Sequence, residues 1–388
     1  MAIRRSNPVS AILLALVLLL ATLPVLASTL IPAPPQVAAR AWLVMDPETG
    51  VVIAAHNEHE RFAPASLTKM MTSYIVEREL QNGNISEQDM VTISEKAWRT
   101  GGSRMFVQVG TQVSVIDLLK GVIIQSGNDA SVALAEYVAG SERAFADMMN
   151  QHAARLGMVN TNFENSTGLP GDQHYSSAMD LAILGRALII ESPDYYKLNS
   201  EKEFTYNEIR QPNRNRLLWR DESVDGIKTG FTNDAGYCLV TSAVRDGMRL
   251  ITVVMGADSE EARAQQSQSL LNYAFRFYRT QSLYDAGQVM NESRIWGGDG
   301  DLVRLGVAER LAVTLPRGQE DSVEVTLDMP RHIKAPVMQG QELGQVVVSM
   351  NGEQLRSMPL VALESVEQGS LLKRIWHAIM LFFLGFFS

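Results

Sequence analysis

Ser66-Leu67-Thr68-Lys69, Ser126-Gly127-Asn128 and Lys228-Thr229-Gly230 occur in this order along the chain, separated by gaps the size of structural modules. Together they supply a hydroxyl nucleophile with an amine, a second hydroxyl with an amide, and a strand with basic and hydroxyl side chains. Acyl transfer on a peptide that ends in a free carboxylate requires this set of groups. The first pattern alone proves little, because it recurs as Ser370-Leu371-Leu372-Lys373. The other two patterns occur once each, so the prediction rests on the ordered combination.

Ser66 and Lys69 are predicted to lie in the first turn of a helix. Pro64 precedes a segment whose apolar residues recur at helical spacing, namely Leu67, Met71, Tyr74 and Ile75. Lys69 then follows Ser66 by one turn on the same face. The hypothesis is that Ser66 attacks a carbonyl while Lys69, with a pKa lowered by burial and nearby positive charge, accepts its proton. The alternative is a helix cap followed by a surface lysine.

Ser126-Gly127-Asn128 is predicted to form a tight junction between two helices, because an apolar run precedes it and a helical pattern from Ala130 to Ala139 follows. The Ser126 hydroxyl could pass a proton toward a leaving amine. The Asn128 amide could hold both the substrate backbone and Lys69.

Lys228-Thr229-Gly230 is predicted to lie on a strand at the edge of the cleft, where an extended peptide could pair with it. Lys228 would add positive charge near the reacting centre, and Thr229 would offer a hydroxyl to a terminal carboxylate. Gly230 would let the ligand backbone come close.

The order of strand-like and helical stretches along the chain predicts an α+β first domain built on one antiparallel sheet with a helical cluster. Two strands near the start, 41–45 and 51–55, are separated from two later ones, 238–244 and 250–255, by helical stretches. A helix over 260–278 should cover the sheet.

After this helix the chain shows short apolar runs broken by Gly, Pro and Asp, including a hairpin signal at Asn351-Gly352. We therefore expect four regions: a signal peptide at 1–27, a catalytic domain at 28–284, a small β-rich domain at 285–365, and a C-terminal amphipathic helix at 366–388.

The N-terminal residues predict export of the protein, and the C-terminal residues predict binding to a membrane surface. Arg4 and Arg5 precede an apolar run and the small-residue site Val25-Leu26-Ala27, a pattern typical of a signal cleaved after Ala27. A helix over 375–388 would extend only about 21 Å, which is too short to span a bilayer. Its basic residues and Trp376 favour a surface anchor, with docking on the protein's own core as the alternative.

The net charge, the single cysteine and the placement of two histidines argue against certain partners and kinds of site. Removing Arg4 and Arg5 with the signal would take the formal net charge from −9 to −11, which argues against nucleic-acid partners. Cys238, the only cysteine, lies in an apolar run and is predicted to be a buried strand residue. His56 and His59 stand in a polar, turn-like stretch without a metalloprotease pattern, so neither a metal nor a cofactor is expected.

With these motifs in place, the chain resembles the D-alanyl-D-alanine carboxypeptidases of the low-molecular-weight penicillin-binding protein class, of the penicillin-binding protein 5 and 6 type. The resemblance covers nearly the whole chain. It implies the β-lactamase-like fold of penicillin-recognising serine transferases, followed by the β-rich domain and the C-terminal helix. It also implies removal of terminal D-alanine from peptidoglycan stem pentapeptides through an acyl-enzyme, covalent inhibition by penicillins, and a part in wall remodelling and cell shape.

The resemblance assigns roles to residues of this chain. Ser66 is the nucleophile, Lys69 its base, and Ser126, Asn128 and Lys228 complete the relay. The backbone N–H groups of Ser66 and Phe231 would form the oxyanion hole. Thr229, Gly230 and Arg263 would bind substrate, Arg263 at its carboxylate. Phe231 departs from relatives that place histidine after Lys-Thr-Gly.

Three further expectations follow from the resemblance. The chain should work on the periplasmic side of the inner membrane, held there by its C-terminal helix, with stem peptides and β-lactam antibiotics as ligands and a homodimer left open. One alternative is a β-lactamase, in which Glu164 would be the candidate deacylating residue. The sequence around Glu164, however, lacks the Glu-x-x-Leu-Asn pattern. The other alternative is a penicillin-binding structural protein without turnover.

Overall fold

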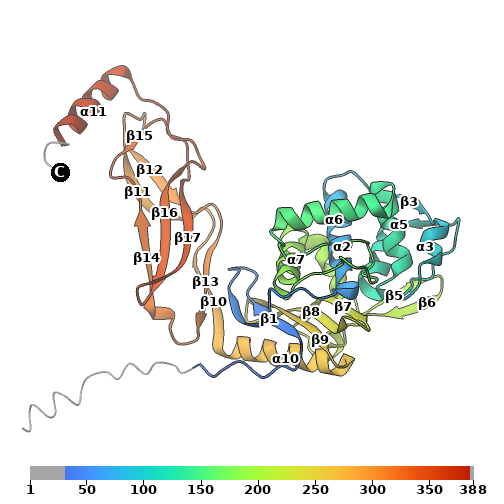
Figure 1. Cartoon of the computed structure of the whole chain (residues 1–388). Helices are drawn as coiled ribbons and strands as arrows, with labels where there is room; N and C mark the ends of the chain where they lie inside the picture. Colours follow the sequence, from blue (N-terminus) through green and yellow to red (C-terminus); the bar gives the residue numbers. More distant parts are fainter. Residues whose placement is uncertain (1–30, 385–388) are drawn as a thin grey trace, which may run out of the picture. The chain divides into compact units, whose positions relative to one another are not determined.

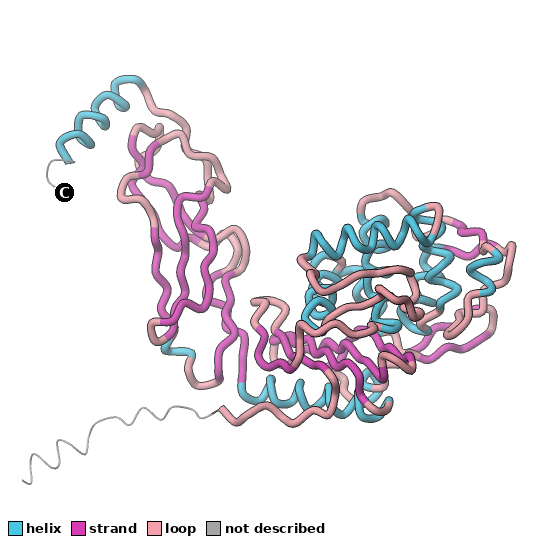
Figure 2. Tube along the Cα trace, viewed as in Figure 1, coloured by secondary structure: helices cyan, strands magenta, loops and turns pink. Residues whose placement is uncertain are grey.

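The computed structural model describes residues 31–384, so the predicted signal peptide and its cleavage site after Ala27 lie outside the described residues. Within the described range, helices, one five-stranded sheet and two short hairpins make up the first domain, whereas the second domain is built almost entirely of strands (Figure 2). The predicted fold class, an α+β first domain followed by a β-rich domain and a C-terminal helix, is confirmed. The exact domain boundaries remain predictions.

The first domain is built on a five-stranded antiparallel sheet with the order β2-β1-β9-β8-β7. Its strands are β1 (Ala41–Met45), β2 (Val52–His56), β7 (Val224–Thr232), β8 (Gly236–Arg245) and β9 (Met248–Ala257). β1 is fully buried and pairs with β9, with Ala41 opposite Met255. The sheet is therefore assembled from distant segments, as the sequence predicts, and β7 forms one edge.

Helices cover both faces of this sheet (Figure 1). The long helix α10 (Glu260–Phe277) packs on β8 and β9, and α7 (Ala178–Glu191) packs on β9 from the other side. The other longer helices are α2 (Lys69–Gln81), α5 (Asn128–Ala139) and α6 (Glu142–Leu156). The apolar side chains of α2, α7 and the sheet share one core, in which Tyr74 and Leu184 are fully buried. This core fixes the start of α2 against the sheet.

Short elements complete the first domain. Two hairpins are formed by β3 (Met90–Thr92) with β4 (Gln112–Ser114), and by β5 (Glu203–Tyr206) with β6 (Ile209–Pro212). The short helices are η1 (Ala65–Thr68), α3 (Glu95–Arg99), α4 (Val115–Lys120), η2 (Gly121–Gln125), α8 (Pro193–Tyr196), η3 (Lys197–Ser200) and α9 (Leu217–Arg220).

The second domain contains a two-stranded sheet, β10-β13, and a six-stranded sheet with the order β14-β16-β17-β12-β11-β15. The strands are β10 (Tyr278–Tyr284), β11 (Val289–Trp296), β12 (Leu302–Gly306), β13 (Leu311–Pro316), β14 (Val323–Asp328), β15 (Ile333–Lys334), β16 (Glu342–Met350) and β17 (Glu353–Ala362), with the short helix η4 (Glu320–Ser322) before β14. The predicted hairpin at Asn351-Gly352 joins β16 to β17, and both turn residues have positive φ, as a two-residue hairpin turn requires.

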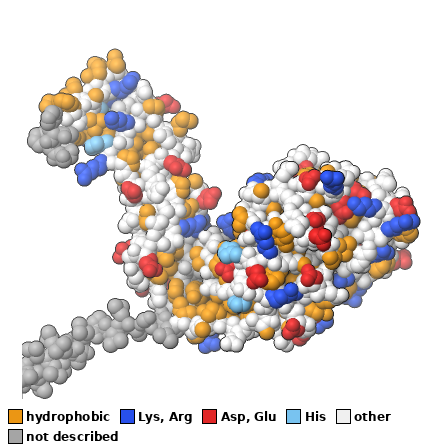
Figure 3. Space-filling view, viewed as in Figure 1, with side chains coloured by type: hydrophobic (Ala, Val, Ile, Leu, Met, Phe, Trp, Pro, Cys, Tyr) orange, Lys and Arg blue, Asp and Glu red, His pale blue; other side chains and the backbone are white. Residues whose placement is uncertain are grey.

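The C-terminal helix α11 spans Leu371–Leu384, so it begins within the predicted helical region 366–388 and four residues before the predicted apolar segment 375–388. His377 is buried against the second domain, where its Nδ1 accepts a hydrogen bond of 2.8 Å from Gly297 N–H and its ring contacts Trp296. Hydrophobic side chains are exposed along the rest of the helix (Figure 3), among them Leu372, Trp376 and Phe382. Among residues 31–384, no helix is both long enough and apolar enough to cross a membrane.

Candidate active site

Ser66 lies in the short 3₁₀ helix η1, directly before α2. The sequence predicts its place in a first helical turn, and the structure differs only in that the α-helical geometry begins at Lys69. A 3₁₀ turn is common at helix starts. The turn is enclosed from two sides: a Cβ added at Gly168 would overlap the Ala65 carbonyl, and one at Gly230 would lie 3.1 Å from the Pro64 carbonyl oxygen. Ser66 is thus held on a rigid turn.

Lys69 is completely buried beneath the serine. Its Nζ donates hydrogen bonds to Ser66 Oγ at 3.0 Å and to the Thr167 carbonyl at 2.6 Å. Burial and, next, the positive charge of Arg214 lower the pKa of Lys69 to about 7, while Asp129 acts in the opposite direction. Near neutral pH a large share of Lys69 is therefore an uncharged amine that can accept the serine proton. The alternative of a surface lysine is wrong.

Ser126 occupies the predicted junction between helices in a constrained form. η2 is a single π-helical turn, a feature often found at functional sites, and Ser126 follows it with a left-handed φ of 65°. Within the described part of the chain, the buried Ser126 hydroxyl has no hydrogen-bond partner. Strain and an unpaired buried hydroxyl are costly, which is consistent with a group kept for a ligand.

Asn128 begins α5, but its amide makes a different contact from the predicted one. Its Nδ2 donates to the Gly101 carbonyl at 2.6 Å, and no hydrogen bond to Lys69 is present among the described residues. The prediction of a direct contact between Asn128 and Lys69 is therefore wrong in this structure. The amide is held by a loop 27 residues away, a contact that local spacing could not reveal.

Asp129 was missed by the sequence reasoning. Its buried carboxylate accepts hydrogen bonds from the backbone N–H groups of Met105, Phe106 and Val107, which pins that loop to the start of α5. An acidic residue in the first turn of a helix is the only local signal that could have indicated it. Asp129 therefore supports the wall of the cleft on which Ser126 lies.

Lys228 and Thr229 lie on β7, the edge strand, as predicted. The Lys228 Nζ donates to the Thr229 carbonyl at 3.2 Å. Burial lowers the pKa of Lys228 well below its usual range, and the charges of Lys69, Arg214 and Arg263 act in the same direction. The lowered pKa works against the predicted positive charge on Lys228 and agrees with its predicted place in a proton relay.

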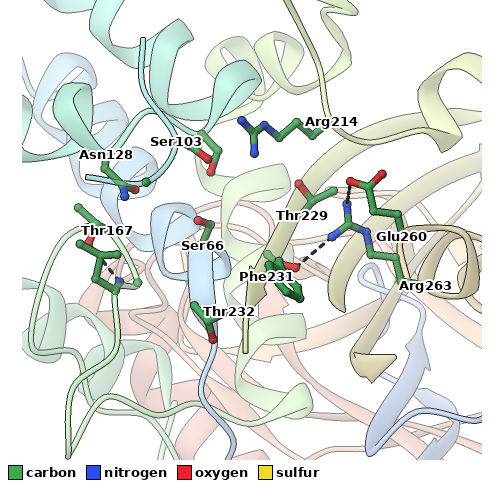
Figure 4. Close-up of a pocket in the computed structure, with 15 residues that line it drawn as sticks. Ser66, Ser103, Asn128, Thr167, Arg214, Thr229, Phe231, Thr232, Glu260 and Arg263 are labelled. Carbon is green, nitrogen blue, oxygen red and sulfur yellow. Dashed lines mark hydrogen bonds and ion pairs between the residues drawn. The ribbon is translucent and has the colours of Figure 1, made fainter. Parts of the chain in front are cut away.

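Phe231 and Arg263 complete the side of the pocket nearest β7. The Phe231 ring is about half exposed and packs on Tyr237 at a centroid distance of 4.3 Å. The Arg263 side chain is buried, with one terminal nitrogen donating to the Gly230 carbonyl at 3.0 Å and the other 3.3 Å from a Glu260 carboxylate oxygen (Figure 4). Arg263 is therefore not a helix-surface arginine, which was the alternative interpretation.

A pocket of about 400 Å³ brings most of these groups together. Ser66, Ser126, Asn128, Thr229, Gly230, Phe231 and Arg263 all line it, whereas Lys69 and Lys228 are buried below its surface. Arg214 and Glu260 also line it, and neither was found from the sequence, because no local pattern marks them (Figure 4). Across residues 31–384, no cluster of His, Cys, Asp or Glu is arranged to hold a metal ion.

A loop that precedes His174 closes the far side of the pocket. Thr167 and Leu169 from this loop line the pocket. The buried His174 anchors it, since its Nε2 lies 2.8 Å from Thr68 Oγ1 and its Nδ1 accepts from the Glu164 backbone N–H at 3.1 Å. Burial and then the charge of Lys69 lower the pKa of His174 to about 4. The neutral ring therefore ties the loop to η1.

Comparison with known proteins finds a matching family model for each of the two domains. Residues 28–259 match the family model described as D-alanyl-D-alanine carboxypeptidase, and residues 278–368 match that of the penicillin-binding protein 5 C-terminal domain. The D-alanyl-D-alanine carboxypeptidase DacC of Escherichia coli (strain K12) is 46% identical over 363 residues, covering 91% of this chain and 90% of that protein.

Solved structures agree with the sequence comparison. Penicillin-binding protein 5 of Haemophilus influenzae is 42% identical, with a TM-score of 0.82 over 87% of this chain and 100% of that chain. Penicillin-binding protein D2 of Listeria monocytogenes, solved in its ampicillin-bound form, is 29% identical with a TM-score of 0.58 over 63% of this chain and 100% of that chain. The chain belongs to the D-alanyl-D-alanine carboxypeptidase family, in the branch that carries a penicillin-binding protein 5 C-terminal domain.

Proposed function

We propose that this carboxypeptidase removes the terminal D-alanine of peptidoglycan stem pentapeptides through an acyl-enzyme on Ser66. The observation that carries the assignment of roles is the Lys69 amine, which lies 3.0 Å from Ser66 Oγ and has a pKa of about 7. A nucleophile with a base within hydrogen-bond reach, beside groups suited to a carboxylate, is the arrangement that the reaction needs.

The acylation step starts from the contact between Ser66 and Lys69. Ser66 Oγ attacks the carbonyl carbon of the penultimate D-alanine while its proton passes to the neutral Lys69. The backbone N–H groups of Ser66 and Phe231 stabilise the oxyanion. As the peptide bond breaks, the leaving nitrogen takes a proton through the Ser126 hydroxyl, which recovers one from the protonated lysine.

Deacylation reverses these transfers with water in place of the leaving D-alanine. A water molecule gives a proton to the relay and attacks the ester carbonyl. The bond between Ser66 Oγ and the carbonyl carbon then breaks, and Ser66 recovers its proton. Lys228, buried and with a lowered pKa, takes part in this relay.

Substrate binding involves the edge of the sheet. The peptide lies along β7, where the Thr229 hydroxyl and Arg263 meet its terminal carboxylate and Asn128 meets its backbone. β-Lactams present a comparable carboxylate and a strained amide to the same groups. The ampicillin-bound Listeria monocytogenes relative supports this second class of ligand.

Two alternatives remain to be separated by experiment. For the β-lactamase alternative, Glu164 would have to activate the deacylating water, but its carboxylate accepts from the Gln173 backbone N–H at 3.2 Å and it is not among the pocket-lining residues. A structural protein without turnover would bind penicillin without releasing D-alanine. The constellation of Ser66, Lys69 and Ser126 is complete, which favours turnover.

The test is D-alanine release from a peptide ending in D-alanyl-D-alanine, together with labelling by a fluorescent penicillin. Ser66→Ala should abolish both. Ser370→Ala is the matched control, because it removes the serine of the same four-residue pattern, which lies directly before α11, and should leave both unchanged. Retained activity in Ser66→Ala would disprove the mechanism. Labelling without D-alanine release would support the silent alternative, and rapid penicillin turnover the β-lactamase.

We also propose that the chain works on the periplasmic side of the inner membrane, remodelling the wall and so contributing to cell shape, with α11 lying on the membrane surface. The apolar side chains of α11 support this, since Leu372, Ile375 and Trp376 are at least half exposed. Deletion from Lys373 onward should release the mature protein from membranes; continued association would point to the N-terminus instead. The homodimer stays a prediction, which light scattering of the truncated protein would test.

A further inference from the structure

Glu260 places a carboxylate of the protein itself in the pocket where a substrate carboxylate is expected. It lines the same pocket as Ser66 and Thr229, and one of its oxygens lies 3.3 Å from a terminal nitrogen of Arg263 (Figure 4). Its side chain is 42% exposed, so it is reachable from the pocket rather than sealed in the core.

Three features hold this carboxylate in place. Glu260 is the first residue of α10, whose N-terminal cap is the Ser259 hydroxyl, and a carboxylate is favoured at a helix start. Its second oxygen accepts a hydrogen bond of 2.6 Å from Arg216. The carboxylate is thus shared between the half-exposed Arg216 and the buried Arg263.

Arg263 has few donors left for a ligand. One terminal nitrogen faces the Gly230 carbonyl at 3.0 Å and the Cys238 carbonyl at 3.5 Å, while the other faces Glu260. Burial lowers the pKa of Arg263, and the Glu260 carboxylate acts in the opposite direction. A second carboxylate that approaches Arg263 therefore meets a cation that is already paired.

We propose that Glu260 is an internal competitor for the substrate carboxylate, which weakens the binding of ligands with a free carboxylate and so sets the specificity of the site. This inference rests on the proposed function, because it takes Arg263 as the group that meets that carboxylate. An incoming carboxylate must displace Glu260 from Arg263 or bind beside a like charge, and either event costs affinity.

Glu260→Gln tests the proposal, since it removes the charge and keeps the shape and an amide oxygen. The matched control is Glu261→Gln, which removes the same charge one residue further along α10. Glu261 pairs with Arg220 at 2.7 and 2.8 Å and does not line the pocket. Melting curves of both variants would show that they are folded, and Glu260→Ser serves as a second variant.

The first measurement compares acylation by benzylpenicillin with acylation by its methyl ester, which lacks the carboxylate. Glu260→Gln should raise the second-order rate constant for benzylpenicillin by about two- to fivefold, the size expected of a half-exposed ion pair, and leave the ester unchanged. Glu261→Gln should change neither rate constant. The second measurement is peptide hydrolysis, in which Glu260→Gln should lower KM by a similar factor with little change in kcat.

Three outcomes would overturn the proposal. Slower acylation or a higher KM in Glu260→Gln would mean that Glu260 orients Arg263 for the ligand. An equal gain with the ester would show that the carboxylate of the ligand is not involved. An equal gain in Glu261→Gln would show a general effect of net charge. Failure of the wild type to release D-alanine would contradict the proposed function alone, because the penicillin comparison would still test Glu260.

Discussion

Substitution of Arg214 is the sharpest test of how the site lowers the pKa of Lys69 so that this residue can act as a base. The lowering of the Lys69 pKa from 10.5 to about 7 corresponds to about 5 kcal/mol in favour of the neutral amine. Burial is the largest cause, and the Arg214 charge is the next. Because the Arg214 charge is a smaller cause than burial, we take its contribution as on the order of one pKa unit, or about 1.4 kcal/mol. Arg214→Gln should therefore raise the Lys69 pKa by about one unit.

The expected kinetic result depends on pH in a defined direction. Because the neutral amine is the active form, acylation should rise with pH through the Lys69 pKa of about 7 in the wild type. In Arg214→Gln the rise should be centred about one unit higher. At pH 7 the neutral fraction then falls from about one half to about one tenth, so acylation slows about fivefold. Above pH 9 the pKa effect should disappear.

The assay is the second-order rate constant for acylation by benzylpenicillin, measured from pH 5.5 to 10. The midpoint of the profile reports the pKa of the base, whereas its plateau reports any effect of Arg214→Gln that does not depend on this pKa, so the two effects are measured separately. Arg210→Gln is the control, because it removes the same charge from the exposed hairpin of β5 and β6, where Arg210 pairs with Glu203. An unmoved midpoint in Arg214→Gln would refute the electrostatic reasoning.

Two further predictions concern the loop that encloses η1. Gly168→Ala should slow acylation at least about tenfold, since its left-handed φ of 82° is strained for alanine and the new methyl would overlap the Ala65 carbonyl. Gly140→Ala carries the same backbone strain with nothing within 4 Å, so it should cost about 1 kcal/mol of stability and leave acylation unchanged; equal rates in both variants would contradict the prediction. His174, with a native pKa of about 4 against 6.5 when unfolded, should cause loss of stability as the pH falls from 6.5 toward 4, by up to about 3 kcal/mol, because the unfolded state binds the proton first. Urea unfolding at pH 7 and 4.5 should show a smaller loss in His174→Gln, and an equal loss would exclude His174 as the cause.

The elements that local patterns determine could be predicted from the sequence. The strands β8 and β9 follow from two apolar runs around the Asp246-Gly247 turn, where both residues have the positive φ that a tight hairpin needs. The proximity of Ser66 and Lys69 follows from their spacing of three on a helical turn. In both cases neighbouring residues along the chain fix the geometry.

What could not be predicted depends on contacts between distant segments. Arg214 and Glu260 enter the pocket from parts of the chain that carry no motif, and only the packing of α10 on the sheet brings Glu260 to Arg263. The partner of Asn128 is the carbonyl of Gly101, and the carboxylate of Asp129 holds the backbone of the same loop at Met105, so both contacts join segments far apart in the sequence. The π-helical turn before Ser126 likewise has no sequence period of its own.

In the proposed mechanism, the positive charge around the pocket serves two purposes that oppose each other when substrate binds. Arg214 and Arg263 attract a carboxylate, and Arg214 also keeps Lys69 neutral, but a bound carboxylate screens that charge and favours the protonated amine. If charge alone lowered the pKa of Lys69, substrate binding would therefore raise this pKa again and leave Lys69 protonated, so that it could not act as the base. Burial is the larger cause, and a ligand that displaces water from the pocket can only strengthen it. The burial of Lys69 under the serine is thus what allows one cluster of cations both to bind an anion and to leave a working base.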